Sequence, residues 1–247
     1  MKRFCALNIG NTHTACAVGI ASADGSFQWE SVRRFKSSAI PFGELPIDIL
    51  TVYASVVPQL TAVMQAKFPG SIPCAAQNIP MIDFSDAPPT LGMDRMANCA
   101  ALLQSSPSGI VIDVGTAITL EVIKNRKFIG GAILPGTAIL AKAMHDYTGA
   151  LPLIESSIAT DIQTFVPETL TVDAMRIGVQ SAAVGGTLHL LDKFLQKLPE
   201  KSPVFVCGGN RQSILNQHTI VKLIDGGDDF TLRGVGTIAV SHLQKIL

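Results

Sequence analysis

The sequence predicts an α/β protein built from two similar halves, because one strand-turn-strand pattern occurs twice and helical segments follow each copy. The first copy reads CALNIGNTHTACAVGI and the second reads GIVIDVGTAITLEVI. An ungapped overlay places Asn8 on Asp113 and Thr14 on Thr119. Of the 247 residues, 47% are hydrophobic, which is enough to bury two cores of ordinary size.

The first half reads as a meander of strands followed by a further strand and two helices. The apolar runs FCALNI and TACAVGI flank the turn Gly-Asn-Thr, and Asp24-Gly25 marks a second turn before FQWESVRRF. DILTVYASVV predicts a buried strand, and Pro58 can open a helix that ends before Pro69-Gly70. DRMANCAAL predicts a further helix with Asp94 in its first turn, where a negative charge is favoured.

The second half repeats this order. GIVIDV, ITLEVI and KFIGGAIL predict strands with a turn near Asn125, and TAILAKAMHDY follows Pro135-Gly136 with helical spacing. A long helical stretch begins at TVDAMRIG, and Gly185-Gly186 can break it in two. The strands PVFVCGG and IVKLID come next, separated by a short helix, and a closing helix is expected from about Gly234.

The domain boundary is expected in a cluster of turn residues. Ser105, Ser106, Pro107 and Ser108 lie between a predicted helix and a predicted strand. We therefore expect an N-terminal domain of residues 1–105 and a C-terminal domain of residues 106–247.

Charge and hydropathy exclude several classes of partner. Lysine plus arginine and aspartate plus glutamate both number 19, and no basic run is longer than Arg33-Arg34, which argues against a nucleic-acid footprint or a polybasic membrane patch. The N-terminal stretch reaches Asn and Gly too early for a signal-peptide core, and no apolar run is long enough to span a bilayer. We expect a cytoplasmic protein that binds neither nucleic acid nor membrane.

The cysteines and histidines point to no metal or disulfide framework. The five cysteines form no Cys-x-x-Cys pair and lie mostly in apolar runs, so they read as small buried side chains in a reducing compartment. The five histidines show no paired ligand spacing, which argues against a zinc site. His13, in the first turn, is expected to face solvent.

The two glycine turns are candidate phosphate sites. Glycine lets the backbone approach a ligand closely, and the N–H groups and hydroxyls of such a bend can donate to phosphate oxygens. Asp113 lies just before its glycine and needs a cation between it and a phosphate, so it predicts a metal ion there. An ordinary hairpin turn is the alternative, and a single copy would favour it; two copies at matching positions favour the phosphate site.

Paired hairpins of this kind resemble those of the acetate kinase, sugar kinase, heat-shock ATPase and actin superfamily. Four stretches narrow the resemblance: LGMDRMANCAAL, IDVGTAITLEVI, GGAILPG and TVDAMRIG. In this order they resemble the type III pantothenate kinases over nearly the whole chain. The resemblance implies two actin-like (ribonuclease H-like) α/β domains facing each other across a nucleotide cleft. It also implies ATP-dependent phosphorylation of pantothenate to 4'-phosphopantothenate, the first step of coenzyme A biosynthesis.

The resemblance further implies a set of site residues for the nucleotide and its ions. The first hairpin, the second turn and the glycine turn after VFVC are implied to bind ATP through Asn8, Gly10, Asn11, Thr12, Thr14, Thr116, Gly208 and Gly209. Asp113 matches the position that holds a monovalent cation, potassium or ammonium, and magnesium accompanies the nucleotide.

The resemblance also implies a substrate loop. It makes Asp94 the proton acceptor and gives Gly92, Met93 and Arg95 to pantothenate binding. Thr171 matches a threonine that reaches the substrate from the neighbouring subunit of a homodimer with shared active sites. From the residues alone, an acceptor for the alcohol proton and a structural ion pair at a helix start are equally good interpretations of Asp94 and Arg95.

Two positions depart from the family pattern. The usual tyrosine before the substrate loop is Ser85 here, with Phe84 adjacent, and the usual aspartate of the first hairpin is Asn8. Asparagine keeps the shape and one carbonyl acceptor but loses a full negative charge. These departures leave open a kinase for another alcohol, and a catalytically weak or silent relative that acts as a nucleotide-binding regulatory or accessory protein.

Overall fold

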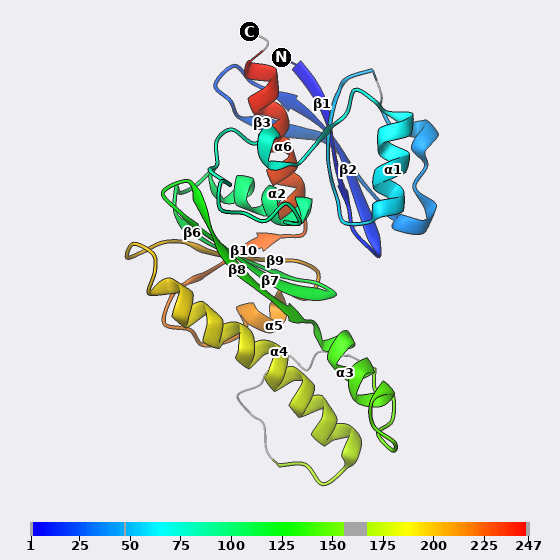
Figure 1. Cartoon of the computed structure of the whole chain (residues 1–247), viewed down its shortest axis with the longest axis vertical. Helices are drawn as coiled ribbons and strands as arrows, with labels where there is room; N and C mark the ends of the chain where they lie inside the picture. The colour runs from blue at the N-terminus through cyan, green and yellow to red at the C-terminus, as the bar shows by residue number, and fades with distance from the viewer. Residues whose placement is uncertain (1, 47, 156–166, 246–247) are drawn as a thin grey trace. The chain divides into compact units, whose positions relative to one another are not determined.

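The chain forms two compact units, shown in Figure 1. Unit 1 comprises the chain up to Ser105, residues Arg126–Phe128 and the chain from Asp229 onwards; unit 2 comprises Ser106–Asn125 and Ile129–Asp228. The range expected for the second domain differs from unit 2 in two segments, Arg126–Phe128 and the chain from Asp229 onwards, which both belong to unit 1. The computed structural model describes residues 2–46, 48–155 and 167–245.

Unit 1 contains a five-stranded sheet in the order β3-β2-β1-β4-β5. Its strands are β1 (Lys2–Ile9), β2 (His13–Ala21), β3 (Phe27–Lys36), β4 (Leu50–Ser55) and β5 (Ile72–Pro73). The first three strands pair antiparallel, and β4 pairs parallel to both β1 and β5. The predicted meander is confirmed, and β5 is a short strand that the sequence pattern did not predict.

Helices cover both faces of this sheet. They are α1 (Pro58–Lys67), α2 (Met93–Leu102) and α6 (Phe230–Gln244), with short 3-10 turns at Ser37–Ala39, Phe42–Glu44 and Ala76–Asn78. Figure 1 shows α6 and α1 on opposite faces of the strands. Helix α1 begins at Pro58 as predicted, because proline is pre-organised for a first helical position. Helix α6 begins at Phe230, earlier than the start expected near Gly234.

The alternation of side chains along β1 divides the core of unit 1. Phe4 packs against the rings of Phe27 and Trp29, with centroids 5.5 and 5.8 Å away. On the opposite face, Cys5, Leu7 and Ile9 join a buried cluster. Both faces of β1 are therefore apolar, as expected for the central strand of a sheet that is covered on both sides.

Unit 2 repeats the sheet of unit 1. Its strands are β6 (Gly109–Val114), β7 (Ala117–Lys124), β8 (Lys127–Pro135), β9 (Val204–Cys207) and β10 (Leu223–Gly227), in the order β10-β9-β6-β7-β8. Strand β6 pairs antiparallel to β7 and parallel to β9, as β1 pairs with β2 and β4. The two sheets thus have the same topology, which confirms that the chain contains two similar halves.

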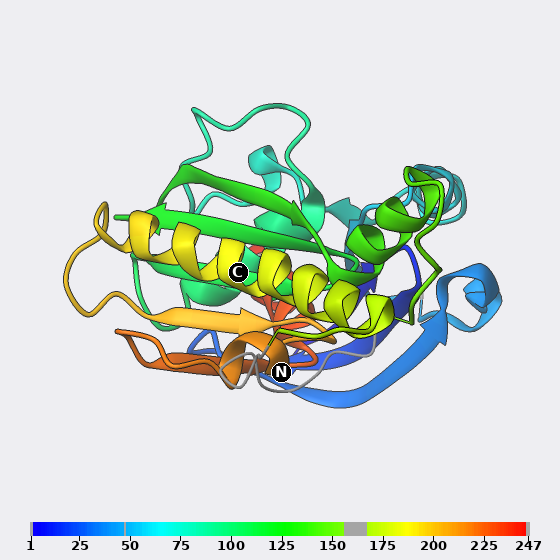
Figure 2. The same cartoon turned by 90° about the horizontal axis from the view of Figure 1, so that it is seen from below.

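The helices of unit 2 are α3 (Thr137–Asp146), α4 (Thr171–Leu195) and α5 (Gln212–Leu215). Helix α4 is continuous, so the expected break at Gly185-Gly186 is wrong. Figure 2 shows α4 crossing one face of the sheet. Its buried side chains pack there against the strands, and this tertiary packing outweighs the low helix propensity of two glycines.

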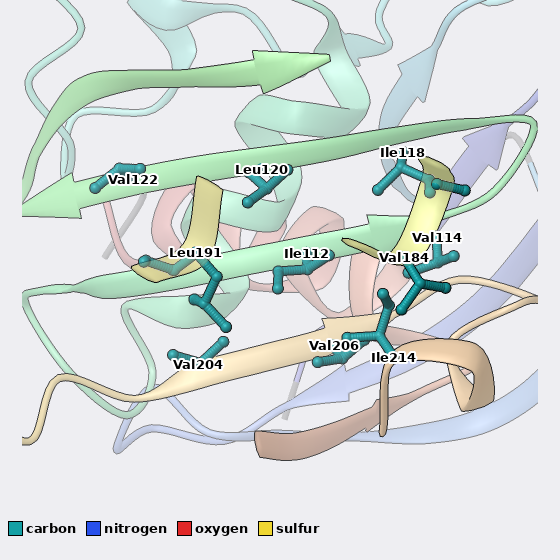
Figure 3. Close-up of a cluster of buried hydrophobic side chains, with 12 residues drawn as sticks. Ile112, Val114, Ile118, Leu120, Val122, Val184, Leu191, Val204, Val206 and Ile214 are labelled. Atoms are coloured by element: carbon teal, nitrogen blue, oxygen red, sulfur yellow. The ribbon is translucent and has the colours of Figure 1, made fainter. Parts of the chain in front are cut away.

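The core of unit 2 lies between this sheet face and the helices. Figure 3 shows side chains from strands, α4 and α5 meeting in one buried cluster, among them Ile112, Leu120, Val206, Val184, Leu191 and Ile214. The members from β6 alternate along the strand, so the residues between them, including Asp113, lie on the other face.

No helix among the described residues is both long and apolar enough to cross a membrane. All five cysteines lie in described segments, and all are buried thiols outside any disulfide. Their burial confirms the interpretation based on the apolar runs around them.

Candidate active site

The first glycine turn joins β1 to β2 and exposes polar residues. Asn11, Thr12 and His13 are exposed, and Asn8 is partly buried at the end of β1. The N–H of Gly10 donates to the carbonyl of His13 over 3.0 Å. A Cβ atom at Gly10 would lie only 2.9 Å from that carbonyl oxygen, so a side chain there would strain the turn.

Thr14 supports this turn from the inside. It is fully buried, and its hydroxyl lies 2.9 Å from the hydroxyl of Ser37, which donates over 2.6 Å to the carbonyl of Gly10. The hydroxyl of Thr14 therefore does not face solvent in this structure, unlike the exposed Thr12, so burial argues against a direct contact with phosphate. Ser37 belongs to no motif, so no sequence pattern predicts its role.

The second glycine turn is shorter than the first. The β1–β2 ladder closes with Ile9 opposite Thr14, whereas the β6–β7 ladder closes with Val114 opposite Ile118. The connecting residues are 10–13 in the first turn and 115–117 in the second. The ungapped overlay is therefore wrong on the return strands, where Thr14 corresponds to Ile118 rather than to Thr119.

Gly136 packs closely against the second turn. Its N–H donates to the carbonyl of Thr116 over 3.0 Å, and a Cβ atom at this position would lie 2.5 Å from that oxygen. Thr116 itself is exposed. The glycine that ends the GGAILPG motif is thus required for close approach of α3, which begins at the next residue.

Asp113 lies beside the glycine turn that follows β9. In the parallel ladder Asp113 is opposite Cys207, and Gly208 has a φ of 89°. A Cβ atom on Gly208 would overlap the carboxylate of Asp113 and lie 2.6 Å from the carbonyl oxygen of Val114. The structure therefore brings Asp113 and Gly208 together within unit 2, and Gly209 is exposed next to them.

Asp94 occupies the first turn of α2, in unit 1. Its Oδ1 atom accepts a hydrogen bond of 2.8 Å from the N–H of Arg95. A Cβ atom on Gly92 would lie 2.5 Å from the same oxygen, so the carboxylate folds back over a glycine at the helix N-cap. Burial raises the pKa of Asp94 above its ordinary value, and the Arg95 N–H and charge offset only part of this effect.

Met93 and Arg95, on either side of Asp94, pack against different groups. Met93 is partly buried and packs against the apolar cluster that contains Ile9, which links the start of α2 to the end of β1. The guanidinium of Arg95 lies over the ring of Phe128, 6.0 Å from its centroid. The rings of Phe84 and Phe128 are 5.9 Å apart, and both are buried.

Ser85 differs from this aromatic pair in its burial. It is exposed, and its N–H donates over 2.8 Å to the Asp83 carboxylate. The aromatic group beside the substrate loop is therefore Phe84 together with Phe128. Phe128 lies far from the loop in sequence, so only tertiary structure could identify it.

Thr171 is the first residue of α4 and is exposed. It belongs to unit 2, whereas Asp94 and its neighbours belong to unit 1. The structure of one chain thus leaves the side chain of Thr171 accessible.

The family is decided by comparison with known proteins. Residues 4–193 match the family model described as type III pantothenate kinase. The chain belongs to the type III pantothenate kinase family. Membership makes it a kinase, and this family implies that it uses ATP and acts on a small molecule.

Two curated members of the type III pantothenate kinase family illustrate the similarity. A protein of Kosmotoga olearia is 32% identical over 201 residues, covering 78% of this chain and 75% of its own length. One from Methylacidiphilum infernorum is 29% identical over 207 residues, covering 79% of this chain and 73% of its own length.

A solved structure supports the fold. A Baf family protein from Campylobacter jejuni superposes with a TM-score of 0.65 at 21% identity, covering 97% of this chain and 98% of its own. Together with the repeated sheet topology, this similarity confirms the predicted actin-like (ribonuclease H-like) fold of the two units.

Proposed function

We propose that this protein phosphorylates pantothenate to 4'-phosphopantothenate with ATP, the first step of coenzyme A biosynthesis. The observation that carries the proposal is the match to the family model over a range that includes Asp94 and Asp113. The setting of Asp94 adds a chemical reason. A carboxylate with a raised pKa is a better proton acceptor than an ordinary one, because its basicity is closer to the working pH.

In this proposal Asp94 accepts the proton of the pantothenate alcohol while the alcohol oxygen attacks the γ-phosphorus of ATP. The bond from that phosphorus to the β–γ bridging oxygen breaks, and ADP leaves. Arg95 binds the pantothenate carboxylate, since a guanidinium can form paired hydrogen bonds with it. Its stacking on Phe128 supports this role because the ring restricts the side chain. Gly92 and Met93 shape the start of the loop.

ATP is bound, in this proposal, by the polar groups of the glycine turns. The exposed Asn11, Thr12 and Thr116 are the candidate donors to phosphate oxygens, and Gly10 keeps the first turn tight beside them. Asn8 offers an amide at the same turn. A Cβ atom at Gly209 would meet nothing within 4 Å, which supports a close approach of the adenosine there, next to Gly208.

The donor groups fit ions that arrive with the nucleotide. Among the described residues no group of three or more His, Cys, Asp or Glu side chains could hold a metal ion. Magnesium usually takes only one or two carboxylates and completes its shell with water and phosphate oxygens, so a magnesium ion that arrives with the nucleotide does not need a cluster of protein ligands. In the proposal, Asp113 holds the monovalent cation, potassium or ammonium, and magnesium neutralises charge on the transferred phosphoryl group.

The working unit is proposed to be a homodimer in which Thr171 completes the substrate site of the partner. Its exposure at the start of α4 supports the proposal. So does the exposed position of Gly178 and Gly185 on the same helix, where a Cβ atom would meet nothing within 4 Å and a second helix can approach closely. Light scattering at micromolar concentration tests it, and an active monomer contradicts it.

The amide of Asn8 supports a second candidate function. Without a carboxylate at this turn, the protein would bind magnesium less tightly, and a weak or silent relative could act as a nucleotide-binding regulatory protein. Loss of one supporting group at a metal site typically costs about 10–100-fold in affinity or activity, so catalysis is weakened in a weak relative and absent in a silent one.

Thermal unfolding with ligands distinguishes these functions. Magnesium with ATP, and pantothenate added to them, should each raise the melting temperature if the protein is a pantothenate kinase, because ligands that bind only the folded state stabilise it. Stabilisation by the nucleotide alone supports a kinase for another alcohol. If either pattern of stabilisation is seen but no substrate is phosphorylated, the result supports a catalytically silent relative.

A further inference from the structure

A single arginine joins three segments at the edge of the sheet of unit 2. The Nε of Arg211 donates over 2.7 Å to the Oδ1 of Asp225, and its Nη1 pairs with the carboxylate of Asp228. The same Nη1 donates over 3.3 Å to the carbonyl of Gly208. The side chain is only 18% exposed, which restricts its freedom to leave this arrangement.

The Arg211 contacts bear on the turn that holds Asp113. Gly208 accepts from the backbone N–H of Arg211 as well as from its guanidinium. The next segment of the turn is fixed by the N–H of Asn210, which donates over 2.9 Å to the carbonyl of Val114. Since Gly208 lies directly against the carboxylate of Asp113, any shift of this turn changes the space around that carboxylate.

The acidic partners of Arg211 are themselves held in place. The Oδ1 of Asp225 also accepts from the N–H of Gly227 over 2.8 Å, and Gly227 has a φ of 77°. This N–H and the charge of Arg211 lower the pKa of Asp225, so it is ionised at neutral pH. The guanidinium is therefore anchored to the end of β10 by charge-assisted hydrogen bonds, which are stronger than neutral ones.

The corresponding turn of unit 1 is built differently. Ser55 lies opposite Ile9 in the ladder, at the position equivalent to Gly208. Its hydroxyl accepts from Thr61 over 2.8 Å and donates to the carbonyl of Val57 over 3.3 Å. Neutral hydroxyls thus hold the turn of the half that carries Asn8, whereas an arginine with two carboxylates holds the turn of the half that carries Asp113.

We propose that Arg211 is a positioning residue for Asp113. Anchored by Asp225 and Asp228, it fixes the Gly208 turn against the carboxylate of Asp113 and so sets the affinity for the monovalent cation and for the nucleotide beside it. This inference rests on the proposed function of Asp113 and of the glycine turn.

The test measures ATP binding by calorimetry over a potassium series, using the intact protein with Arg211→Gln, Arg211→Lys and Arg3→Gln. Arg3→Gln is the matched control, because Arg3 donates twice to Glu30, over 2.9 and 2.7 Å, in the sheet of unit 1. For Arg211→Gln we expect the Kd of ATP to rise about 10–100-fold. The potassium concentration that gives half of its full effect on ATP binding should rise by about the same factor. Arg211→Lys should recover part of the loss, and Arg3→Gln should match the natural protein.

A merely structural role for Arg211 makes a different prediction. It would lower the melting temperature of Arg211→Gln and leave the potassium dependence of ATP binding unchanged, and that result overturns the inference. If Arg211→Gln does not fold, the same measurement is made on Asp228→Asn, which keeps the contact between Arg211 and Asp225. An unchanged potassium dependence of ATP binding in that variant overturns the inference. Binding does not require turnover, so ATP binding that depends on potassium and Arg211 supports the inference even if pantothenate is not phosphorylated.

Discussion

Gly234 of α6 lies directly against the main-chain carbonyl of Ala97 in α2, so closely that a Cβ atom would overlap it. The same two helices share a buried hydrogen bond of 2.8 Å from Thr231 to the Oδ1 of Asn98. Because α2 begins beside Asp94, the last helix of the chain holds the helix that carries the proposed catalytic carboxylate.

Gly234→Ala is expected to lower the free energy of unfolding by about 1–3 kcal/mol or more, since the added methyl group forces two packed helices apart. Urea denaturation measures this loss. Gly43→Ala is the control, because nothing lies within 4 Å of its added Cβ atom. Equal stability of both variants would show that the helices do not pack this closely.

Asp94→Asn should raise the free energy of unfolding at pH 7. Burial raises the pKa of Asp94, so the folded state prefers the protonated carboxyl. Ionisation of the buried carboxyl destabilises the folded state. This destabilisation is absent below the pKa of the unfolded chain, about 3.9, and it grows as the pH rises through the higher pKa of the folded state. The advantage of the variant should therefore shrink as the pH is lowered toward about 4. Denaturation curves at several pH values measure it, and a variant that is less stable at pH 7 contradicts the burial effect.

The strands could be predicted from the sequence, because buried strands of both sheets are continuous apolar runs bounded by turn residues. The repeat also predicted the shared topology of the two halves. The packing of α6 in unit 1 was not predictable. The sequence pattern predicts a closing helix only from about Gly234, whereas Gly234 lies inside α6 and allows its close approach to Ala97.

The site could be predicted only as far as its local motifs. Gly92 and Asp94 are neighbours in sequence, and their contact follows from the helix start. The burial of Thr14 depends on Ser37, and the setting of Arg95 depends on Phe128, both of which come from distant segments. Such contacts arise from the tertiary fold, and a single sequence carries no periodic signal for them.

The two threonines of the first turn should separate stability from binding. Thr14→Val removes a buried hydroxyl that contacts Ser37, so it should lower the free energy of unfolding by about 1–3 kcal/mol. Thr12→Val, at an exposed position, should leave stability unchanged and raise the KM for ATP. Unfolding curves and initial rates test the pair. The opposite pattern would make Thr14 the residue that contacts phosphate.

Asn8→Asp is expected to lower the magnesium concentration needed for half-maximal rate. The added carboxylate attracts the cation, and it takes little extra room because the two side chains are nearly isosteric. The gain should be largest at low magnesium and fade near saturation. Initial rates over a magnesium series measure it, and parallel curves for the two proteins would show that this position does not contribute to magnesium binding.

The proposed activity is tested most directly by mass spectrometry, which detects 4'-phosphopantothenate after incubation of the protein with ATP, magnesium, potassium and pantothenate. We expect time-dependent product with the natural protein and a rate about 10²–10⁴-fold lower with Asp94→Asn, which keeps its fold. Absence of product at every magnesium concentration, with both the natural protein and Asn8→Asp, would contradict the claim that this chain is a working pantothenate kinase.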